Sequence, residues 1–142
     1  MPSADDMAAA VGMEAANELP DALGRIKHCL GQLNDEQVWW RSQPSHNGIG
    51  NLILDLCGNV WQWIVSGLGG AVDKRDRPAE FSERGPIPKD VLVRKLEAVV
   101  SEARGVLGRL TTGQLLEVRR IEGFDATGLA ARGELLVGED EP

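Results

Sequence analysis

The chain has 142 residues, of which 15 are basic and 22 acidic, so its formal net charge is -7. This length fits one domain that buries roughly 70% of the surface its unfolded chain exposes. The negative charge opposes non-specific attraction to DNA, RNA or anionic lipid, and no segment approaches the roughly 20 apolar residues that a membrane span needs. The sequence therefore predicts a soluble, cytoplasmic protein with no nucleic-acid partner and no membrane partner.

The first predicted helix covers residues 17–33. Residues 1–16 are small and polar enough to form a flexible N-terminus, and Asn17 offers a side-chain cap ahead of Pro20, which a first helical turn tolerates. Alternatively, Pro20 kinks one longer helix. His28 lies on the polar side, where a histidine is more often solvated than a ligand. Apolar residues recur at spacings of four and three and predict one apolar seam: Leu19, Leu23, Ile26, Leu30 and Leu33.

A connector over residues 34–46 contains the adjacent Trp39 and Trp40. We expect the two indoles to close one end of the core, because each buries a large area. A ligand-stacking platform is the alternative interpretation. His46 ends the connector, and Asn47 is a good cap for the helix that follows.

The second predicted helix covers residues 48–68 and includes the stretch NLILDLCGNVWQWI. Its apolar residues occupy well over half of the circumference, which predicts a helix covered on two sides, by its own bundle or by a partner subunit. A narrow polar strip remains, made of Asn51, Asp55, Asn59, Gln62 and Ser66. Asp55 therefore lies in a strip that either faces water or lines a polar seam inside the bundle.

Residues 67–88 form a long connection that is rich in glycine, proline and charges of alternating sign. Interleaved signs predict weak local ion pairs rather than a phosphate site, and Phe81 is the expected anchor into the core. Pro88 then begins a third helix, and Thr111 or Thr112 caps a short turn after it. The apolar residues of the third helix keep a four-three spacing: Leu92, Leu96, Val99, Ala103, Val106 and Leu110. The three helices predict an all-α, up-and-down helical bundle.

The two cysteines, Cys29 and Cys57, each fall within a predicted helix. A buried thiol in a reducing compartment is a small hydrophobe, and helical spacing places no histidine or basic residue beside either one to activate it. Both are therefore predicted to be packing residues, and a disulfide stays open as the alternative.

Three sequence blocks, NGIGNLILDLCGNVWQWIVSGLGG, DKRDRPAEFSERGPIP and RRIEGFDATGLAA, resemble the DinB-like family of four-helix bundles, in a branch labelled only as a domain of unknown function. The resemblance covers roughly residues 26–130. It implies a bundle domain over residues 17–130 with three main helices and a degenerate or missing fourth. Residues 131–142 would be a divergent acidic tail, and the abrupt change after Ala130 is what a truncated or frameshifted terminus would produce.

The resemblance also implies a metal site. Members of the wider family hold a divalent ion with three histidines, one from the second helix and two from the fourth, and some are thiol transferases or isomerases. Judged by the flanking Leu56, Gly58 and Asn59, the second-helix histidine corresponds to Asp55, and a carboxylate would shift the preference toward harder ions. Residues 131–142 contain no histidine and no cysteine. Asp55 is thus the one implied metal ligand, for Zn, Ni or Mn if the family site survives.

Two functions are open at this point. Catalytic zinc needs three protein ligands and an open position, so the incomplete set favours a non-catalytic binding or interaction module that forms a homodimer through its second helix. The alternative is a divalent-metal-dependent hydrolase or thiol transferase in which a partner subunit completes the site around Asp55. Glu122 and Asp125 could reach a hard cation, whereas helical spacing does not place His46 with Asp55. Without a metal, Asp55 would be a hydrogen-bonded or water-facing carboxylate. The sequence identifies no small-molecule substrate.

Overall fold

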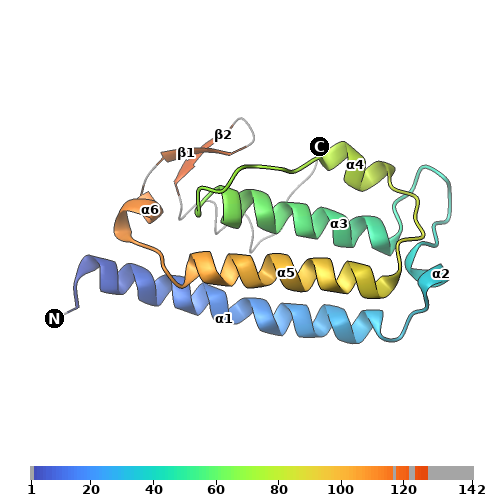
Figure 1. Ribbon diagram of the computed structural model, residues 1–142, viewed down its shortest axis with the longest axis horizontal. Helices are drawn as coiled ribbons and strands as arrows, with labels where there is room; N and C mark the ends of the chain where they lie inside the picture. Colours follow the sequence, from blue (N-terminus) through green and yellow to red (C-terminus); the bar gives the residue numbers. More distant parts are fainter. Residues whose placement is uncertain (1, 117, 122–123, 128–142) are drawn as a thin grey trace.

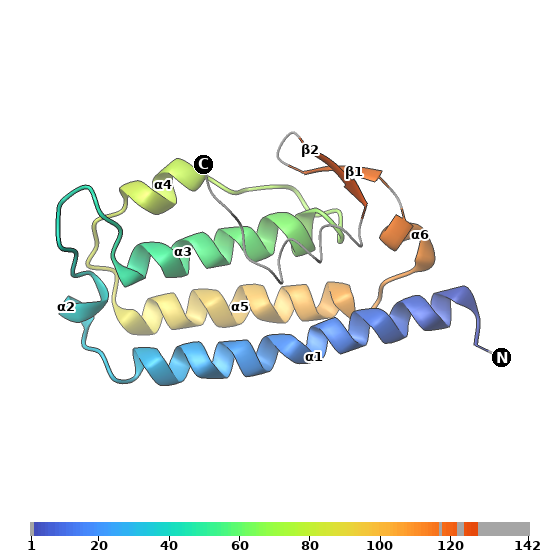
Figure 2. The ribbon, with the colours of Figure 1, turned by 180° about the vertical axis from the view of Figure 1, so that it is seen from behind.

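Three long helices, α1 (Ala4–Leu30), α3 (Ile49–Val60) and α5 (Lys89–Leu107), lie side by side in the computed structural model, which describes residues 2–116 and the backbone of residues 118–121 and 124–127 (Figures 1 and 2). α5 lies between α1 and α3 and packs against both. The predicted all-α bundle with three main helices is confirmed. Of the described helices, none is both long and apolar enough to cross a membrane.

The three long helices do not all alternate in direction. α1 is antiparallel to α5: Lys27, near its end, pairs with Glu97 at 2.8 Å, whereas Ala16 accepts a hydrogen bond from Arg104 further along α5. α3 runs in the same direction as α5, because the long connection returns along the length of the bundle before α5 begins (Figure 1). The connection therefore lies alongside α3 instead of forming a tight turn.

α1 begins at Ala4, well before the expected cap at Asn17. Ser3 and Asp6 form a capping box, in which Ser3 Oγ accepts from the Asp6 amide at 3.1 Å and Asp6 Oδ2 accepts from the Ser3 amide at 3.0 Å. Residues 4–16, part of the segment expected to be a flexible N-terminus, thus form the first turns of the helix. Of the two alternatives, one longer helix that contains Pro20 is the one observed.

The buried positions in the first half of α1 are occupied by small residues. Ala8, Gly12, Ala15 and Ala16 are all buried. A Cβ atom on Gly12 would overlap the backbone carbonyl oxygen of Leu107, so the glycine permits a closer approach of α1 to α5 than any larger residue would. The alanine-rich composition that suggested flexibility is therefore what allows two helix backbones to pack tightly.

The connector between α1 and α3 contains the short helix α2 (Asp35–Val38) and the two adjacent tryptophans. Trp39 is buried and donates from its indole nitrogen to the carbonyl of Ile87 at 2.8 Å. It closes this end of the core, as predicted. Trp40 is 69% exposed, so the expectation that both indoles are buried is wrong for Trp40.

The second predicted helix is divided into α3 and a π-helix, η1 (Trp61–Ser66). The N-cap residue of α3 is Gly48 instead of the predicted Asn47. The wider turns are closed by bonds such as Gly67 N to Gln62 O at 2.9 Å. Four consecutive residues of η1 are buried: Gln62, Trp63, Ile64 and Val65. Consecutive burial requires contact on more than one side of the helix, in agreement with the prediction of a helix covered on two sides.

Shorter elements complete the described structure. α4 (Arg77–Ser82) lies within the connection, and α5 begins directly after Pro88, as predicted. α6 (Thr112–Leu116) is capped by Thr111, whose Oγ1 accepts from the Gln114 amide at 3.2 Å. The strands β1 (Val118–Ile121) and β2 (Phe124–Thr127) pair as an antiparallel hairpin, which the sequence analysis did not predict. The predicted change after Ala130 and the tail at 131–142 lie outside the described residues.

Candidate functional site

Asp55, the predicted site residue, faces the guanidinium of Arg75. Arg75 Nη2 lies 2.7 Å from Asp55 Oδ1, and the Arg75 side chain is only 1% exposed. Arg75 belongs to the connection, whose charges were predicted to form weak local pairs. That prediction is wrong for Arg75, because its guanidinium is buried and its ion pair joins the connection to α3.

Arg75 uses its other nitrogens to bridge further elements. Its Nη1 donates to Gln62 Oε1 in η1 at 2.7 Å, its Nη2 lies 3.1 Å from Glu80 Oε1 in α4, and its Nε lies 3.2 Å from Glu80 Oε2. A buried guanidinium is stable only when its donors are satisfied, and its planar fork suits several oxygens at once. Burial raises the pKa of Glu80 against the opposing effect of Arg75, and the nearby Asp55 carboxylate raises it further.

Gly58 allows the side chains of Arg75 and Glu80 to approach the backbone of α3 closely. A Cβ atom on Gly58 would overlap Glu80 Oε2 and lie 2.7 Å from Arg75 Nε. Any residue with a side chain here would displace the carboxylate from the guanidinium. A glycine in the middle of a helix costs stability relative to alanine, and the close approach of Glu80 and Arg75 explains its presence.

Asn51 fastens the far end of the connection to the start of α3. Its side chain is fully buried, and its Oδ1 accepts from the Gly48 amide at 3.0 Å and from Arg41 Nη2 at 3.1 Å. Its Nδ2 donates to the carbonyls of Glu80 at 2.9 Å and Glu83 at 2.8 Å. Of the two alternatives for the polar strip, a buried polar seam is the one observed for Asn51, Asn59 and Gln62, whereas the Asp55 side chain stays 27% exposed.

Phe81 is not the anchor into the core that the sequence predicted. It is half-buried, and the guanidinium carbon of Arg77 lies 5.3 Å from its ring centroid. Among the charged residues of the connection, Arg75 is deeply buried, with its side chain at 1% exposure. A polar residue thus holds the connection where an aromatic one was expected.

The surroundings of Asp55 do not fit a divalent metal ion. Besides Arg75, the Nε of Arg77 lies 3.7 Å from Asp55 Oδ1, so a cation placed there would meet two positive groups. Over the described part of the chain, no group of three His, Cys, Asp or Glu side chains is arranged to hold a metal. Glu122 lies outside that part, and Asp125 is described only by its backbone, in β2.

Both histidines are exposed and hydrogen-bonded within their own segments. A ring nitrogen of His28 lies 3.1 Å from Gln32 Nε2, and Nδ1 of His46 lies 2.7 Å from Ser42 Oγ. The prediction of a solvated His28 is confirmed.

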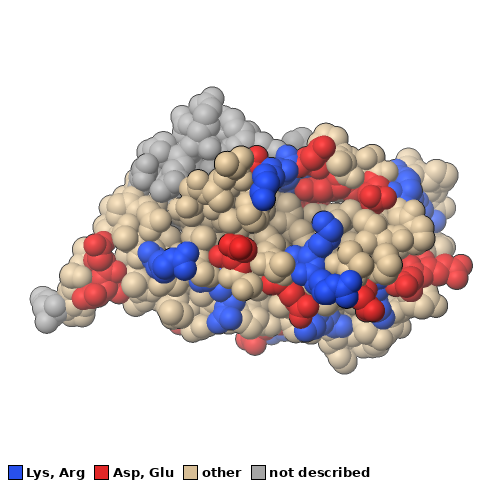
Figure 3. Space-filling model, viewed as in Figure 1, with Lys and Arg blue, Asp and Glu red and all other residues tan. Residues whose placement is uncertain are grey.

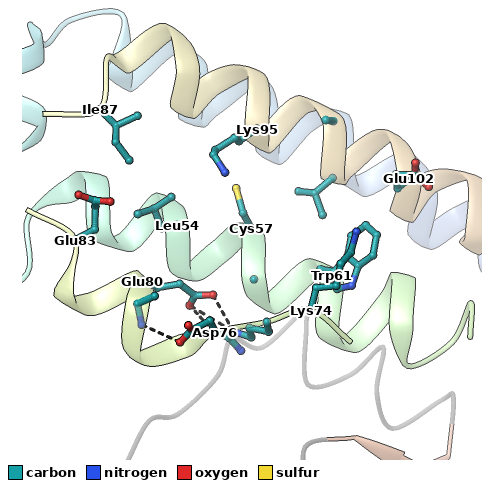
Figure 4. A pocket seen from close by; sticks show the side chains of 15 residues that line it. Leu54, Cys57, Trp61, Lys74, Asp76, Glu80, Glu83, Ile87, Lys95 and Glu102 are labelled. Atoms are coloured by element: carbon teal, nitrogen blue, oxygen red, sulfur yellow. Dashed lines mark hydrogen bonds and ion pairs between the residues drawn. The ribbon is translucent and has the colours of Figure 1, made fainter. Parts of the chain in front are cut away.

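A groove of about 670 Å³ opens between α3 and α5, beside the connection (Figure 4). We call it the α3–α5 groove. Leu54, Ile87 and Val99 supply apolar surface, while Lys95 and Glu102 of α5 line it with charged groups. Across the face shown in Figure 3, basic and acidic side chains are interspersed rather than separated into one-sign areas.

Cys57 lies in this groove as a neutral thiol. Burial raises its pKa to about 11, and the ammonium of Lys95 opposes that effect without cancelling it. Because the thiolate is the nucleophile, a thiol with this pKa is unreactive at neutral pH. Cys29 is exposed, so its predicted burial is wrong, and both cysteines are free.

Trp61 and Lys74 form the part of the groove nearest the end of α3. The Trp61 indole nitrogen donates to the carbonyl of Val72 at 2.9 Å, and the Lys74 ammonium lies 4.5 Å from the centroid of the Trp61 ring. The first contact holds the connection against η1. The second is a cation–π pair, which keeps a positive charge at the groove.

Sequence reasoning missed Arg75, Asn51, Gly58 and Lys95 as site residues. One signal was available for Arg75: a polar strip that contains a carboxylate needs a counter-charge if it is covered, and the adjacent connection contains the basic residues. No pattern in the sequence indicated that Lys95 would lie near Cys57, because the two belong to different helices.

Comparison with known proteins yields no relative of this chain. No protein-family model, no curated protein and no solved structure matches it. The DinB-like resemblance accordingly remains a proposal that rests on the three sequence blocks.

Proposed function

We propose that this chain is a DinB-like domain that works without metal catalysis, as a binding and interaction module. The observation that carries the proposal is the 2.7 Å ion pair between Asp55 and the buried Arg75. The position that corresponds to a metal ligand in the family serves here to fasten the connection to α3. The Arg75 side chain is only 1% exposed, and leaving a buried charge without its partner typically costs about 3–5 kcal/mol, which opposes the loss of this pair to a metal.

Metal analysis of the purified, dialysed protein tests this proposal. We expect neither zinc, nickel nor manganese at a stoichiometric level, and no change in metal content for Asp55→Asn. Asp90→Asn, which alters an exposed carboxylate at the start of α5, is the matched control. Near-stoichiometric metal that disappears in Asp55→Asn alone would overturn the proposal in favour of a metal-dependent hydrolase or thiol transferase.

We also propose that the module forms a homodimer through α3. An apolar groove of about 210 Å³ runs between α1 and α3 over α5, lined by Leu19, Leu23, Ile26, Leu56, Val60, Leu96, Val100 and neighbouring residues. On the same side of α3, Leu52 is 54% exposed and Ile49 is 38% exposed. Contiguous apolar surface of this kind is what a self-complementary interface would remove from water.

Sedimentation velocity over a range of concentrations tests the dimer. We expect a dimer for the wild type and a monomer for Leu52→Glu, because the charge would be buried in the interface. Leu116→Glu, which alters an exposed leucine of α6, should leave the dimer intact. A wild-type protein that stays monomeric throughout would exclude this assembly.

A further inference from the structure

The α3–α5 groove has the size and walls of a small-molecule site. Its volume of about 670 Å³ falls within the roughly 300–1,000 Å³ that is typical of such sites. Three parts of the chain contribute to it: Leu54 and Cys57 from α3, Ile87 from the connection and Val99 from α5. In Figure 4 the side chains of Ile87 and Leu54 lie near one end, Lys95 and Cys57 in the middle, and Trp61 and Glu102 toward the other end.

The basic side chain in the middle of the groove has no counter-charge among the described residues. Lys95 reaches from α5 across the groove toward Cys57 (Figure 4). Within the part of the chain that the structure describes, it takes part in no hydrogen bond and no ion pair. Lys74 adds a second positive charge, which rests on the Trp61 ring at 4.5 Å.

The acidic side chains of the groove are, with one exception, already engaged. Glu80 pairs with Arg75 at 3.1 Å, Asp76 Oδ1 accepts from the Ala79 amide at 3.1 Å, and Glu83 Oε2 accepts from the amides of Arg84 and Gly85, both at 3.1 Å. The exception is Glu102, seven residues after Lys95 on the same helix and therefore about 10 Å further along the axis. These hydrogen bonds leave the charges of Asp76 and Glu83 in place, so the groove lining as a whole is not positive. Among the described residues, the charged groups of the groove without a partner are Lys95 in its middle and Glu102 toward its far end.

We propose that the α3–α5 groove binds a small organic anion, whose charged group is held by Lys95 and whose apolar body lies against Leu54 and Ile87. Glu102 repels an anion at the opposite end and so fixes the orientation of the ligand. Cys57 contributes apolar surface as a neutral thiol, not a nucleophile. The inference names a ligand class for the binding module proposed above and rests on that proposal for its biological meaning.

Titration of the ¹⁵N-labelled full chain with matched probes tests the charge requirement. The probes are 3-phenylpropionate, its neutral amide and 3-phenylpropylamine, which share one apolar body and differ in charge. We expect the carboxylate to shift the amide signals of Cys57, Trp61, Lys95 and Val99. We expect the neutral amide to bind about tenfold more weakly and the amine more weakly still. Equal affinity for the three probes, or shifts confined to other residues, would overturn the proposal.

Two variants assign the charge to Lys95. Lys95→Met should weaken 3-phenylpropionate about tenfold and leave the affinity for the neutral amide unchanged. Glu102→Gln, which alters a charge in the same groove, should leave carboxylate binding equal or tighter. Both positions are exposed, and circular dichroism checks that both variants fold. Unchanged carboxylate binding by Lys95→Met would exclude this role for Lys95.

The two proposals fail separately. A metal-free protein that ignores all three probes would refute the anion site and leave the non-metal module standing. A protein with stoichiometric metal that still discriminates between the carboxylate and the neutral amide would refute the non-metal module and leave the anion site standing.

Discussion

The guanidinium of Arg75 lies 2.7 Å from the carboxylate of Asp55, a residue 20 positions earlier in the sequence. This contact holds the connection against the polar strip of α3. Gln62 and Glu80 accept from the same guanidinium, so one buried side chain joins α3, η1 and α4. The stability of the whole connection should therefore depend on Arg75.

Replacement of Arg75 tests that dependence. We expect Arg75→Ala to lower the free energy of unfolding by about 3 kcal/mol, because Asp55 and Glu80 lose their shared cation in a poorly solvated place. Urea denaturation followed by tryptophan fluorescence measures the change. Arg94→Ala, on an exposed part of α5, is the control and should stay within about 0.5 kcal/mol of the wild type. A loss below about 1 kcal/mol for Arg75→Ala would contradict the assigned role.

A substitution that keeps the shape of the Asn51 side chain tests the hydrogen bonds that it forms. Asn51→Asp removes both Nδ2 donors and turns an oxygen toward the carbonyls of Glu80 and Glu83. We expect a loss of about 3 kcal/mol, because the group is buried and would be both unsatisfied and charged. For a domain of this size that loss lowers the Tm by roughly 10 °C, which differential scanning calorimetry measures. Asn47→Asp, at an exposed position, should change little.

Gly58→Ala probes the space beneath the Arg75–Glu80 pair. The added methyl group would displace Glu80, and we expect a net loss of about 1–2 kcal/mol in chemical denaturation despite the better helix propensity of alanine. Gly24→Ala in α1 is the matched control, because nothing lies within 4 Å of the place that its methyl group would take. It should stabilise the protein by up to about 1 kcal/mol. Equal effects at the two positions would show that the pair tolerates displacement.

The two cysteines should differ in reactivity. At pH 8 we expect iodoacetamide to alkylate the exposed Cys29 more than about tenfold faster than Cys57, whose thiol is protected and largely protonated. Peptide mass spectrometry over a time course measures both rates in one sample, so that Cys29 serves as the internal control. Comparable rates would show that Cys57 is either more open or more acidic than its surroundings imply.

The raised pKa of Cys57 also predicts how stability changes with pH. The folded state keeps the thiol proton up to about pH 11, whereas the unfolded chain releases it near the ordinary value of 9.0. The folded state therefore binds more protons in this window, and the free energy of unfolding falls as the pH rises through it, by about 2 kcal/mol. The difference between wild type and Cys57→Ala should be constant below pH 8 and shrink between pH 9 and 11. A difference that stays constant to pH 11 would contradict the prediction.

The sequence by itself determined the helices and their apolar seams. Leu92, Leu96 and Val99 predicted the buried side of α5, and Pro88 and Thr111 marked where α5 and α6 begin. These features depend on residues a few positions apart, where helical geometry fixes which side chains share a face. The start of α1 was harder to predict, because alanines and glycine fit both a frayed end and a close helix contact, and the contact with Leu107 decides between them.

Only the tertiary structure decided the chemistry of the site. It placed Arg75 on Asp55, left Trp40 exposed while burying Trp39, and brought Lys95 to the groove that contains Cys57. In each case the residue that determines the environment of the side chain is distant in the sequence. Local sequence alone therefore does not show whether a charged group or an indole is buried or paired. Burial and ion pairing depend on three-dimensional neighbours, so the sequence could mark Asp55 as unusual but could not show that the guanidinium of Arg75 lies beside it.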